Sequence, residues 1–272
     1  MPKLESIDGV GIYTNDLKKS KQFYTRTIGL KVRDEDRKTG YIALGATKGG
    51  KDASLNLWQP VAAWGPEMYE AGRKQIGGVT GIGFGTTDLK KTIEALKRKG
   101  VKARVDGESG TFGRFTDPDG NELFLQQPRR PKVHRAGLQN LAFTTVVSRD
   151  VAKSGEFFTK ALGMKALKIP ASEGGGQSFT VYRLSSKGTA IMPFVPTKEM
   201  YDNPSDYDAD MAHIGENTSI GFGTRDIYGL QEALLAKGVR FSLKAERRDW
   251  GGIMARILDP DDNMYAIMQH GR

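Results

Sequence analysis

One phrase occurs twice in this sequence: GIGFGTTDL, from Gly81 to Leu89, returns as SIGFGTRDI, from Ser219 to Ile227. Two other blocks recur in the same order, and the three offsets are 134, 138 and 142 residues. These blocks are DLKKSKQFYTRTIGLKV with DVAKSGEFFTKALGMKA, and RFTDPDGNELFLQQ with RILDPDDNMYAIMQ. Such a period is too long for a solenoid repeat. The chain is therefore predicted to hold two homologous halves.

Composition narrows the class of protein. The 272 residues include no cysteine, which excludes disulfide frameworks, thiolate metal sites and cysteine nucleophiles. With 38% hydrophobic and 27% charged residues, the chain is predicted to be soluble, globular and cytoplasmic, because no apolar run resembles a signal core or a membrane span. The net charge of +9 is spread over the sequence. It favours a lysine-rich solvated surface over nucleic-acid binding, and it disfavours a cationic ligand.

Each half divides again into two similar stretches. Strand patterns over residues 5–16, 78–87, 137–149 and 216–225 each end at an expected helix cap. An amphipathic helix and about three short strands follow each cap. The pattern therefore predicts four βαβββ repeats. The expected caps are Asn15/Asp16, Thr87/Asp88, Arg149/Asp150 and Arg225/Asp226, and Gly100 and Gly238 are expected to end two helices.

This order, with FYTRTIGL, GFGTTDL, GV and DPDGN in register, resembles the vicinal oxygen chelate superfamily, which includes glyoxalase I, extradiol dioxygenases and bleomycin-resistance proteins. The resemblance covers nearly the whole chain. It implies an α+β fold in which four βαβββ units pair into two modules, each an open, curved mixed sheet, or cup, with helices outside. The first module is expected at 1–130, with units at about 1–60 and 77–128, and the linker at 131–136. The second is expected at 137–272, with units at about 137–195 and 216–270.

The resemblance also implies where metal ligands would lie. In catalytic relatives they fall seven residues before the cap aspartate and seven after the first aspartate of DPDG. None of the corresponding residues here carries an imidazole or a carboxylate, so no metal and no cofactor is predicted. A register shift of two would bring in Glu122, but one carboxylate does not make a metal site. The eight positions are Gly9, Asn56, Gly81, Phe124, Phe143, Met192, Ser219 and Ala266.

The segment YDADMAHIGEN could also bind a cation, because it holds Asp208, Asp210, His213 and Glu216 close together in sequence. Its spacing matches no metal motif that we know, so a solvated acidic loop is favoured. The glycines of GGVTGIGFG lie inside a strand rather than in a strand-to-helix loop, which argues against a dinucleotide fingerprint.

The expected cups differ in their floors. Strand alternation would place Gly81, Gly83 and Gly85 on one face, and Gly9, Gly11 and Tyr13 on one face of the first strand. Such a floor either leaves room for a flat ligand or marks tight packing between units. The second cup is expected to be apolar, and either it binds an apolar ligand or it is a filled core. Its expected residues are Phe143, Thr145, Val147, Met264, Ala266 and Met268.

Two insertions, at 58–78 and 192–215, carry aromatic residues that could cover the cups or simply anchor the loops. Their lid candidates are Trp58, Trp64, Met68, Tyr69, Met200, Tyr201 and Tyr207. Arg247, Arg248 and Arg256 could form a positive rim beside Trp250, although solvation is the simpler interpretation. The predicted ligand-binding residues are Tyr13, Asn56, Trp58, Trp64, Met68, Phe124, Phe143, Thr145, Met192, Ser219, Trp250 and Met264.

The sequence thus favours a metal-independent protein that binds a small, partly aromatic or apolar molecule. The alternative is an enzyme of the superfamily: a lyase, isomerase or dioxygenase with an unusual metal site, or a metal-free mechanism through Glu122, Tyr13 or Arg114. Nucleic acid and membrane are not expected partners. The identity of the ligand, the number of working cups and a homodimeric state are left open.

Overall fold

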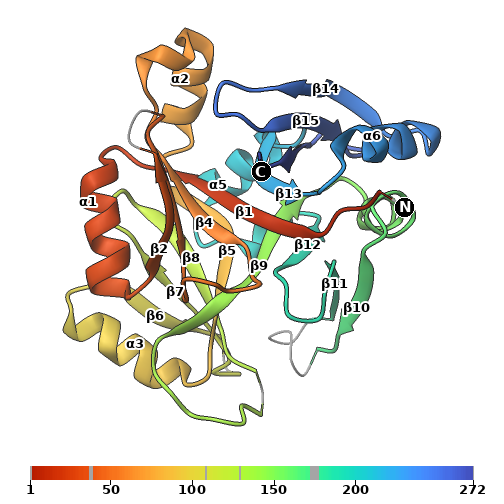
Figure 1. Ribbon diagram of the computed structural model, residues 1–272. Coiled ribbons are helices and arrows are strands. Elements are labelled where there is room, and N and C mark those ends of the chain that lie inside the picture. Colours follow the sequence, from red (N-terminus) through yellow and green to blue (C-terminus); the bar gives the residue numbers. More distant parts are fainter. Residues whose placement is uncertain (1, 37–38, 108, 129, 172–177, 272) are drawn as a thin grey trace. The chain divides into compact units, whose positions relative to one another are not determined.

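The computed structural model of the chain describes residues 2–36, 39–107, 109–128, 130–171 and 178–271. It contains the four expected βαβββ repeats in chain order (Figure 1). The first comprises β1 (Ser6–Tyr13), α1 (Leu17–Gln22) with a π-helical turn η1 (Phe23–Ile28), β2 (Lys31–Asp36), β3 (Tyr41–Gly45) and β4 (Ser54–Trp58). The second comprises β5 (Gly78–Thr86), α3 (Leu89–Arg98), β6 (Ala103–Asp106), β7 (Phe112–Thr116) and β8 (Asn121–Gln126).

The second half repeats this plan. The third repeat comprises β9 (Leu138–Val147), α4 (Val151–Glu156) with a π-helical turn η3 (Phe157–Ala161), β10 (Lys165–Ile169), β11 (Phe179–Arg183) and β12 (Ala190–Phe194). The fourth comprises β13 (Asn217–Gly223), α6 (Ile227–Ala236), β14 (Arg240–Arg247), β15 (Ile253–Leu258) and β16 (Met264–Gln269). The insertions carry short helices: η2 (Ala62–Trp64) and α2 (Pro66–Lys74), then η4 (Lys198–Met200) and α5 (Pro204–Ala212).

The expected helix boundaries are confirmed. At the start of each main helix an aspartate accepts hydrogen bonds from free backbone N–H groups of the first turn, which are the donors that a helix itself leaves unsatisfied. Gly100 and Gly238 follow α3 and α6 with left-handed φ angles of 78° and 79°, a conformation that glycine adopts without steric cost. The capping aspartates are Asp16, Asp88, Asp150 and Asp226.

The strands form two open eight-stranded sheets (Figure 1). One has the order β14-β15-β16-β13-β1-β4-β3-β2, which joins the fourth repeat to the first. The other has the order β10-β11-β12-β9-β5-β8-β7-β6, which joins the third repeat to the second. The expectation that Phe143 and Ala266 share a cup floor was therefore wrong, because β9 and β16 belong to different sheets. Repeats with similar central strands offer similar edges, so sequence similarity does not determine which two will pair.

Two compact units can be described separately. The N-terminal unit contains Val10–Thr144 with Ile169–Phe179, and the C-terminal unit contains Met1–Gly9, Thr145–Lys168 and Thr180–Arg272. Strands β1 and β9 are each divided between them. The start of β1 pairs with β13 in the C-terminal unit, where the Glu5 N–H donates to the Gly223 carbonyl at 2.9 Å. The start of β9 pairs with β5 in the N-terminal unit.

Each sheet has one face under helices and one face open. On β8, Leu123 and Leu125 are fully buried, whereas Glu122 and Phe124 are half-buried on the other face. On β16, Tyr265 and Ile267 are buried in the same way beside α6, and the alternate residues Met264, Ala266 and Met268 face the open side. This period of two indicates a strand with one buried face. No helix among the described residues is long and apolar enough to cross a bilayer.

The repeated phrase contains a bulge. Gly81 and the equivalent Ser219 both have positive φ angles, 67° and 56°. The pairing of β5 with β8 shifts register between Val79 and Gly83, and the pairing of β13 with β16 shifts in the same way. Four steps along β5 or β13 match two steps along the partner strand, so each carries two extra residues that interrupt the alternation of faces. Gly81 therefore lies in the bulge, outside the regular alternation from which a face shared with Gly83 was expected.

Candidate functional site

In the N-terminal unit, aromatic rings fill the open face of the β7–β8–β5–β9 strands. Strand pairing places Arg114 opposite Phe124, Phe124 beside Gly83, and Gly83 opposite Phe143. We call these four residues the filled row. The two rings lie with centroids 6.5 Å apart, and a Cβ on Gly83 would collide with the Phe143 ring. For this sheet, the glycine marks tight packing rather than room for a ligand.

Charges on the same face are neutralised. Arg114 donates from Nε to Asp106 at 2.6 Å and from Nη1 to Glu122 at 2.7 Å, and its guanidinium lies 5.2 Å from the Phe124 ring centroid. Burial lowers the pKa of Arg114, but the hydrogen bonds to Asp106 and Glu122 outweigh it and the net pKa is raised. Glu122 and Arg114, both candidates for metal-free catalysis, are thus bound to each other.

The equivalent positions in the C-terminal unit hold smaller side chains. Arg256 lies opposite Ala266, and Ala266 lies beside Gly221. A Cβ on Gly221 would lie 2.6 Å from the methyl carbon of Met268 and 3.9 Å from the Gly9 carbonyl oxygen, with no ring nearby. We call Arg256, Ala266, Gly221 and Gly9 the open row. Here alanine and glycine stand where the filled row has Phe124 and Phe143.

The N-terminal unit has a second aromatic cluster, on the strands of the first repeat. The Trp58 ring has centroid distances of 4.6 Å to Tyr41 and 6.1 Å to Trp64, and Trp64 lies 6.4 Å from Tyr13. Trp64 comes from η2 in the first insertion, whereas Tyr13, Tyr41 and Trp58 come from β1, β3 and β4. The insertion thus brings Trp64 onto rings of the first repeat's strands. Tyr13, Trp58 and Trp64 are among the ligand-binding residues predicted from the sequence, and Tyr41 is not.

Asn56 lies on the same face of β4 as Trp58, two residues before it. Its side-chain carbonyl oxygen is buried and accepts no hydrogen bond from any described residue. Buried polar atoms almost always have partners, and an unmade bond costs about 1–3 kcal/mol. The sequence contains no signal for this orphan, although it identified Asn56 as a position of interest. We call Asn56, Tyr13, Tyr41, Trp58 and Trp64 the aromatic site.

The residues at the implied metal-ligand positions do not suit a divalent cation. The first sheet offers Gly9, Asn56, Ser219 and Ala266, and the second offers Gly81, Phe124, Phe143 and Met192. One amide and one hydroxyl are the only hard oxygen donors among these side chains, and catalytic metals need carboxylates or imidazoles. Gly81 and Ser219 also lie at bulges. No metal-dependent step can be derived from this set.

The second insertion does not gather its acidic residues into one site. Within the described residues, no group of three or more His, Asp or Glu side chains is placed to hold a metal ion. His213 pairs with Glu216 at 2.7 Å, while Asp210 instead accepts a hydrogen bond from Tyr201. Burial, followed by that hydrogen bond, raises the pKa of Tyr201. Tyr201 and Tyr207 pack on each other with centroids 6.0 Å apart.

The structure separates the remaining predicted ligand-binding residues. Met68 is exposed on α2, with 54% of its surface accessible, and Trp250 is exposed beside the ring of His270. Thr145 lies on β9 and Met192 on β12 of the second sheet, whereas Ser219 and Met264 lie on β13 and β16 of the first sheet. Of the predicted residues, one group both comes together and includes a buried oxygen without a hydrogen bond, that of Asn56. This group is Tyr13, Asn56, Trp58 and Trp64.

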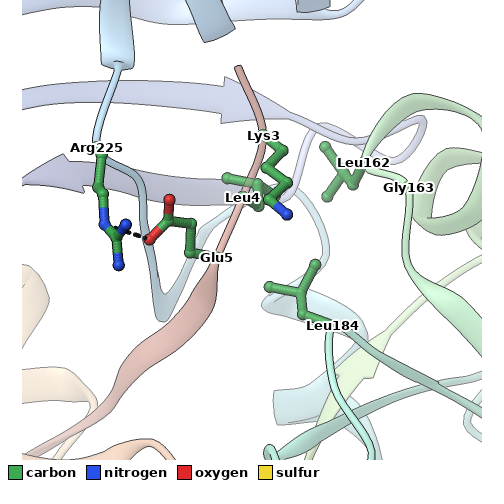
Figure 2. A pocket seen from close by; sticks show the side chains of 7 residues that line it. All are labelled: Lys3, Leu4, Glu5, Leu162, Gly163, Leu184 and Arg225. Atoms are coloured by element: carbon green, nitrogen blue, oxygen red, sulfur yellow. Dashed lines mark ion pairs between the residues drawn. The ribbon is translucent and has the colours of Figure 1, made fainter. Parts of the chain in front are cut away.

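A surface pocket lies elsewhere in the C-terminal unit. Its volume is about 540 Å³, and it opens where the chain start meets the end of η3 and the loop after β13 (Figure 2). Glu5 and Arg225 at its rim pair with each other at 3.1 Å, and this arginine is almost fully exposed. No predicted ligand-binding residue lines this pocket. Its lining residues are Lys3, Leu4, Glu5, Leu162, Gly163, Leu184 and Arg225.

Known proteins share this arrangement of repeats. Glyoxalase I from Zea mays superposes with a TM-score of 0.64 and 18% identity, over 99% of this chain and 92% of that one. A putative dioxygenase from Bacillus subtilis subsp. subtilis str. 168 has a TM-score of 0.64 and 12% identity, over 100% and 87%. The uncharacterized protein YetH of Bacillus subtilis (strain 168) is 29% identical over 129 residues, which are 46% of this chain and 99% of that protein.

At these identities the structural likeness shows the fold alone. The family assignment comes from the sequence model of the Glyoxalase/Bleomycin resistance protein/Dioxygenase superfamily, which matches residues 6–125 and again 140–267. The two matches follow the internal duplication and together cover most of the chain. The chain therefore belongs to the glyoxalase/bleomycin resistance protein/dioxygenase superfamily, with two matched segments in one polypeptide.

Proposed function

We propose that the chain is a metal-independent binding protein that holds a small, partly aromatic molecule at the aromatic site. The observation that carries the proposal is the buried, unpartnered carbonyl oxygen of Asn56 beside Trp58. A flat ligand with a hydroxyl or N–H donor would supply the missing hydrogen bond and stack on the indole rings. Metal independence rests on the donor set, because an amide beside glycine and alanine favours hydrogen bonding over cation coordination.

The three tryptophans of the chain allow a direct test. In a Trp250→Phe background, only Trp58 and Trp64 emit, so their fluorescence reports on the aromatic site alone. We expect naphthol, which has a flat ring and one hydroxyl donor, to quench this emission with a saturable curve. Dialysis against EDTA should leave the affinity unchanged. Loss of binding after chelation would contradict metal independence.

A substitution of Trp64 measures how much its ring contributes to naphthol affinity. Trp64→Leu removes the ring that contacts Tyr13 and Trp58, and we expect it to weaken naphthol binding about fivefold, since one good aromatic contact contributes roughly 1 kcal/mol. Trp250→Leu is the matched control, because it removes an exposed indole in the other unit. Equal affinities in the two variants would exclude the aromatic site as the binding place.

Asn56→Leu tests the hydrogen-bond acceptor with a side chain of similar shape. Removing an unsatisfied buried oxygen should raise the free energy of unfolding by about 1 kcal/mol, measured by chemical denaturation. The same variant should bind naphthol more weakly but methoxynaphthalene, which lacks a donor, about as well as before. An unchanged preference between the two probes would show that the ligand does not donate to Asn56.

A further inference from the structure

Among the described residues, five arginines are half-buried. Three of them have acidic partners: Arg33 pairs with Asp52 at 2.8 Å, Arg114 with Asp106 and Glu122, and Arg248 with Glu246 at 2.5 Å. The other two, Arg183 and Arg256, make no ion pair or hydrogen bond with a described residue. A half-buried guanidinium has lost part of its hydration, so an acidic partner is the usual compensation. Both exceptions lie in the C-terminal unit.

Arg256 is the more informative exception because the chain contains its counterpart. Arg114 and Arg256 occupy the same place in their repeats, on the open face opposite position 124 or 266. Glu122, the partner of Arg114, corresponds to Met264 in the fourth repeat. The aromatic floor of the filled row corresponds to Ala266 and Gly9. The duplication has therefore kept the cation while losing one acid and both rings around it.

The residues that pair with Arg256 on both neighbouring strands are apolar. On β14, Leu243 lies opposite Arg256, with a register shift on either side of this pair. On β16, Ala266 lies opposite Arg256. Glu246 on β14 lies opposite Met254, but it is paired with Arg248. Half-buried methionines extend the same face, since Met254 lies opposite Met268 and Met264 lies opposite Leu258. Methionine side chains are flexible and adapt to the shape of an apolar body. A cation in such surroundings suits a ligand with one anionic end and one apolar end.

We propose that the open row is an anion-binding subsite, where Arg256 binds the carboxylate of an amphiphilic molecule whose apolar body lies over Ala266 and the methionines. A carboxylate can accept two parallel N–H bonds from one guanidinium, which gives both affinity and orientation. This subsite belongs to the C-terminal unit and is independent of the aromatic site in the N-terminal unit. Each of the two sites can therefore be tested without the other.

Methionine methyl groups supply a local readout. In protein labelled with ¹³C at the methionine methyl groups, naphthoate should shift the signals of Met254, Met264 and Met268, which single Met→Leu variants assign. The uncharged naphthamide should shift them much less at equal concentration. Trp58 and Trp64 play no part in this measurement, so the result is separable from the outcome of the fluorescence test.

Three variants decide the proposal. Arg256→Met, which keeps an unbranched stem, should weaken naphthoate binding about tenfold or more, as expected for a lost charge-assisted contact. Arg247→Met is the matched control with the same change of net charge, on an exposed residue with no charge partner among the described residues, and should change affinity less than about twofold. Met264→Glu restores the acid found at Glu122, and it should abolish binding by occupying Arg256.

Two results would overturn the subsite. One is equal loss of naphthoate affinity in Arg256→Met and Arg247→Met, which would indicate attraction to net charge alone. The other is naphthamide binding as tightly as naphthoate, which would show that the guanidinium does not recognise the anion. Ala266→Phe keeps the test decisive if Met264→Glu fails to fold, because it fills the open row with the ring found at Phe124 and should also block naphthoate.

Discussion

The filled row and the open row are the same structural element, built twice from one repeated sequence. In the N-terminal unit, Phe124 and Phe143 cover the glycine and two acids neutralise Arg114. In the C-terminal unit, alanine and glycine leave the face uncovered and Arg256 has no partner among the described residues. The pairing of β5 with β8 matches that of β13 with β16, so at these strands the difference comes from side chains. Beside Arg256, β14 adds two register shifts that β6 lacks. A duplicated sheet can thus close one copy as core and keep the other accessible.

The largest expected effect comes from removing a ring of the filled row. Phe143→Ala should lower the free energy of unfolding by about 3 kcal/mol, because the ring is 92% buried and the glycine beneath it cannot fill the cavity. Urea denaturation measures this. A loss below about 1 kcal/mol would mean that the second sheet is as accessible as the first, and the contrast between the rows would disappear.

Alanine substitutions at Gly83 and Gly221 compare the packing of the two rows directly. Gly83→Ala places a methyl group against the Phe143 ring and should cost about 2 kcal/mol, in the range expected for overpacking. Gly221→Ala meets only the mobile end of Met268 and should cost less than about 1 kcal/mol. Thermal unfolding of the pair compares them under one condition. Equal costs would contradict a difference in packing.

Substitutions of the two arginines should differ in their effect on the free energy of unfolding as well as on binding. Arg114→Met leaves Asp106 and Glu122 without their partner and should destabilise the protein by about 1–2 kcal/mol, a value reduced by their partial exposure. Arg256→Met breaks no ion pair and should be neutral within about 0.5 kcal/mol. High salt should narrow the gap, since screening weakens the Arg114 pairs. A costly Arg256→Met would reveal a structural role for that arginine.

The smallest expected effect concerns the bulge at the start of the repeated phrase. Ser219 adopts a φ of 56°, which costs a side-chain-bearing residue roughly 1 kcal/mol, whereas Gly81 adopts 67° without that cost. Ser219→Gly should therefore stabilise the protein by about 0.5 kcal/mol, and Gly81→Ser should destabilise it by about 1 kcal/mol. Opposite signs in denaturation midpoints are the criterion. Two destabilised variants would assign Ser219 a contact of its own.

Local structure was readable from the sequence, because the information is local. The capping aspartates, the stops at Gly100 and Gly238 and the four βαβββ repeats depend on neighbours a few residues away, and the structure confirms them. The α+β fold with two open sheets also follows from the repeat order. The partner of each repeat does not, because central strands of similar sequence compete for the same edges.

The candidate site was predictable only in part. Tyr13, Asn56, Trp58 and Trp64 were identified by position and type, and the structure brings them together. Tyr41 was missed, since it lies in an ordinary strand and its pairing with Trp58 depends on register across β3 and β4. The orphaned oxygen of Asn56 and the missing partner of Arg256 could not be foreseen. An absent contact is a property of the folded packing, not of any sequence pattern.

The division of β1 between the two units affects how the chain can be completed on the ribosome. Glu5 and Gly223 are 218 residues apart, yet their backbones pair. At about 5–20 residues per second, the first strand waits roughly 10–40 s for its neighbour to be synthesised. Gly83 and Phe143 are only 60 residues apart, so the second sheet can begin pairing much sooner. The sheet that carries both proposed subsites is therefore the last to close, and a truncated chain would leave the edge of β1 exposed.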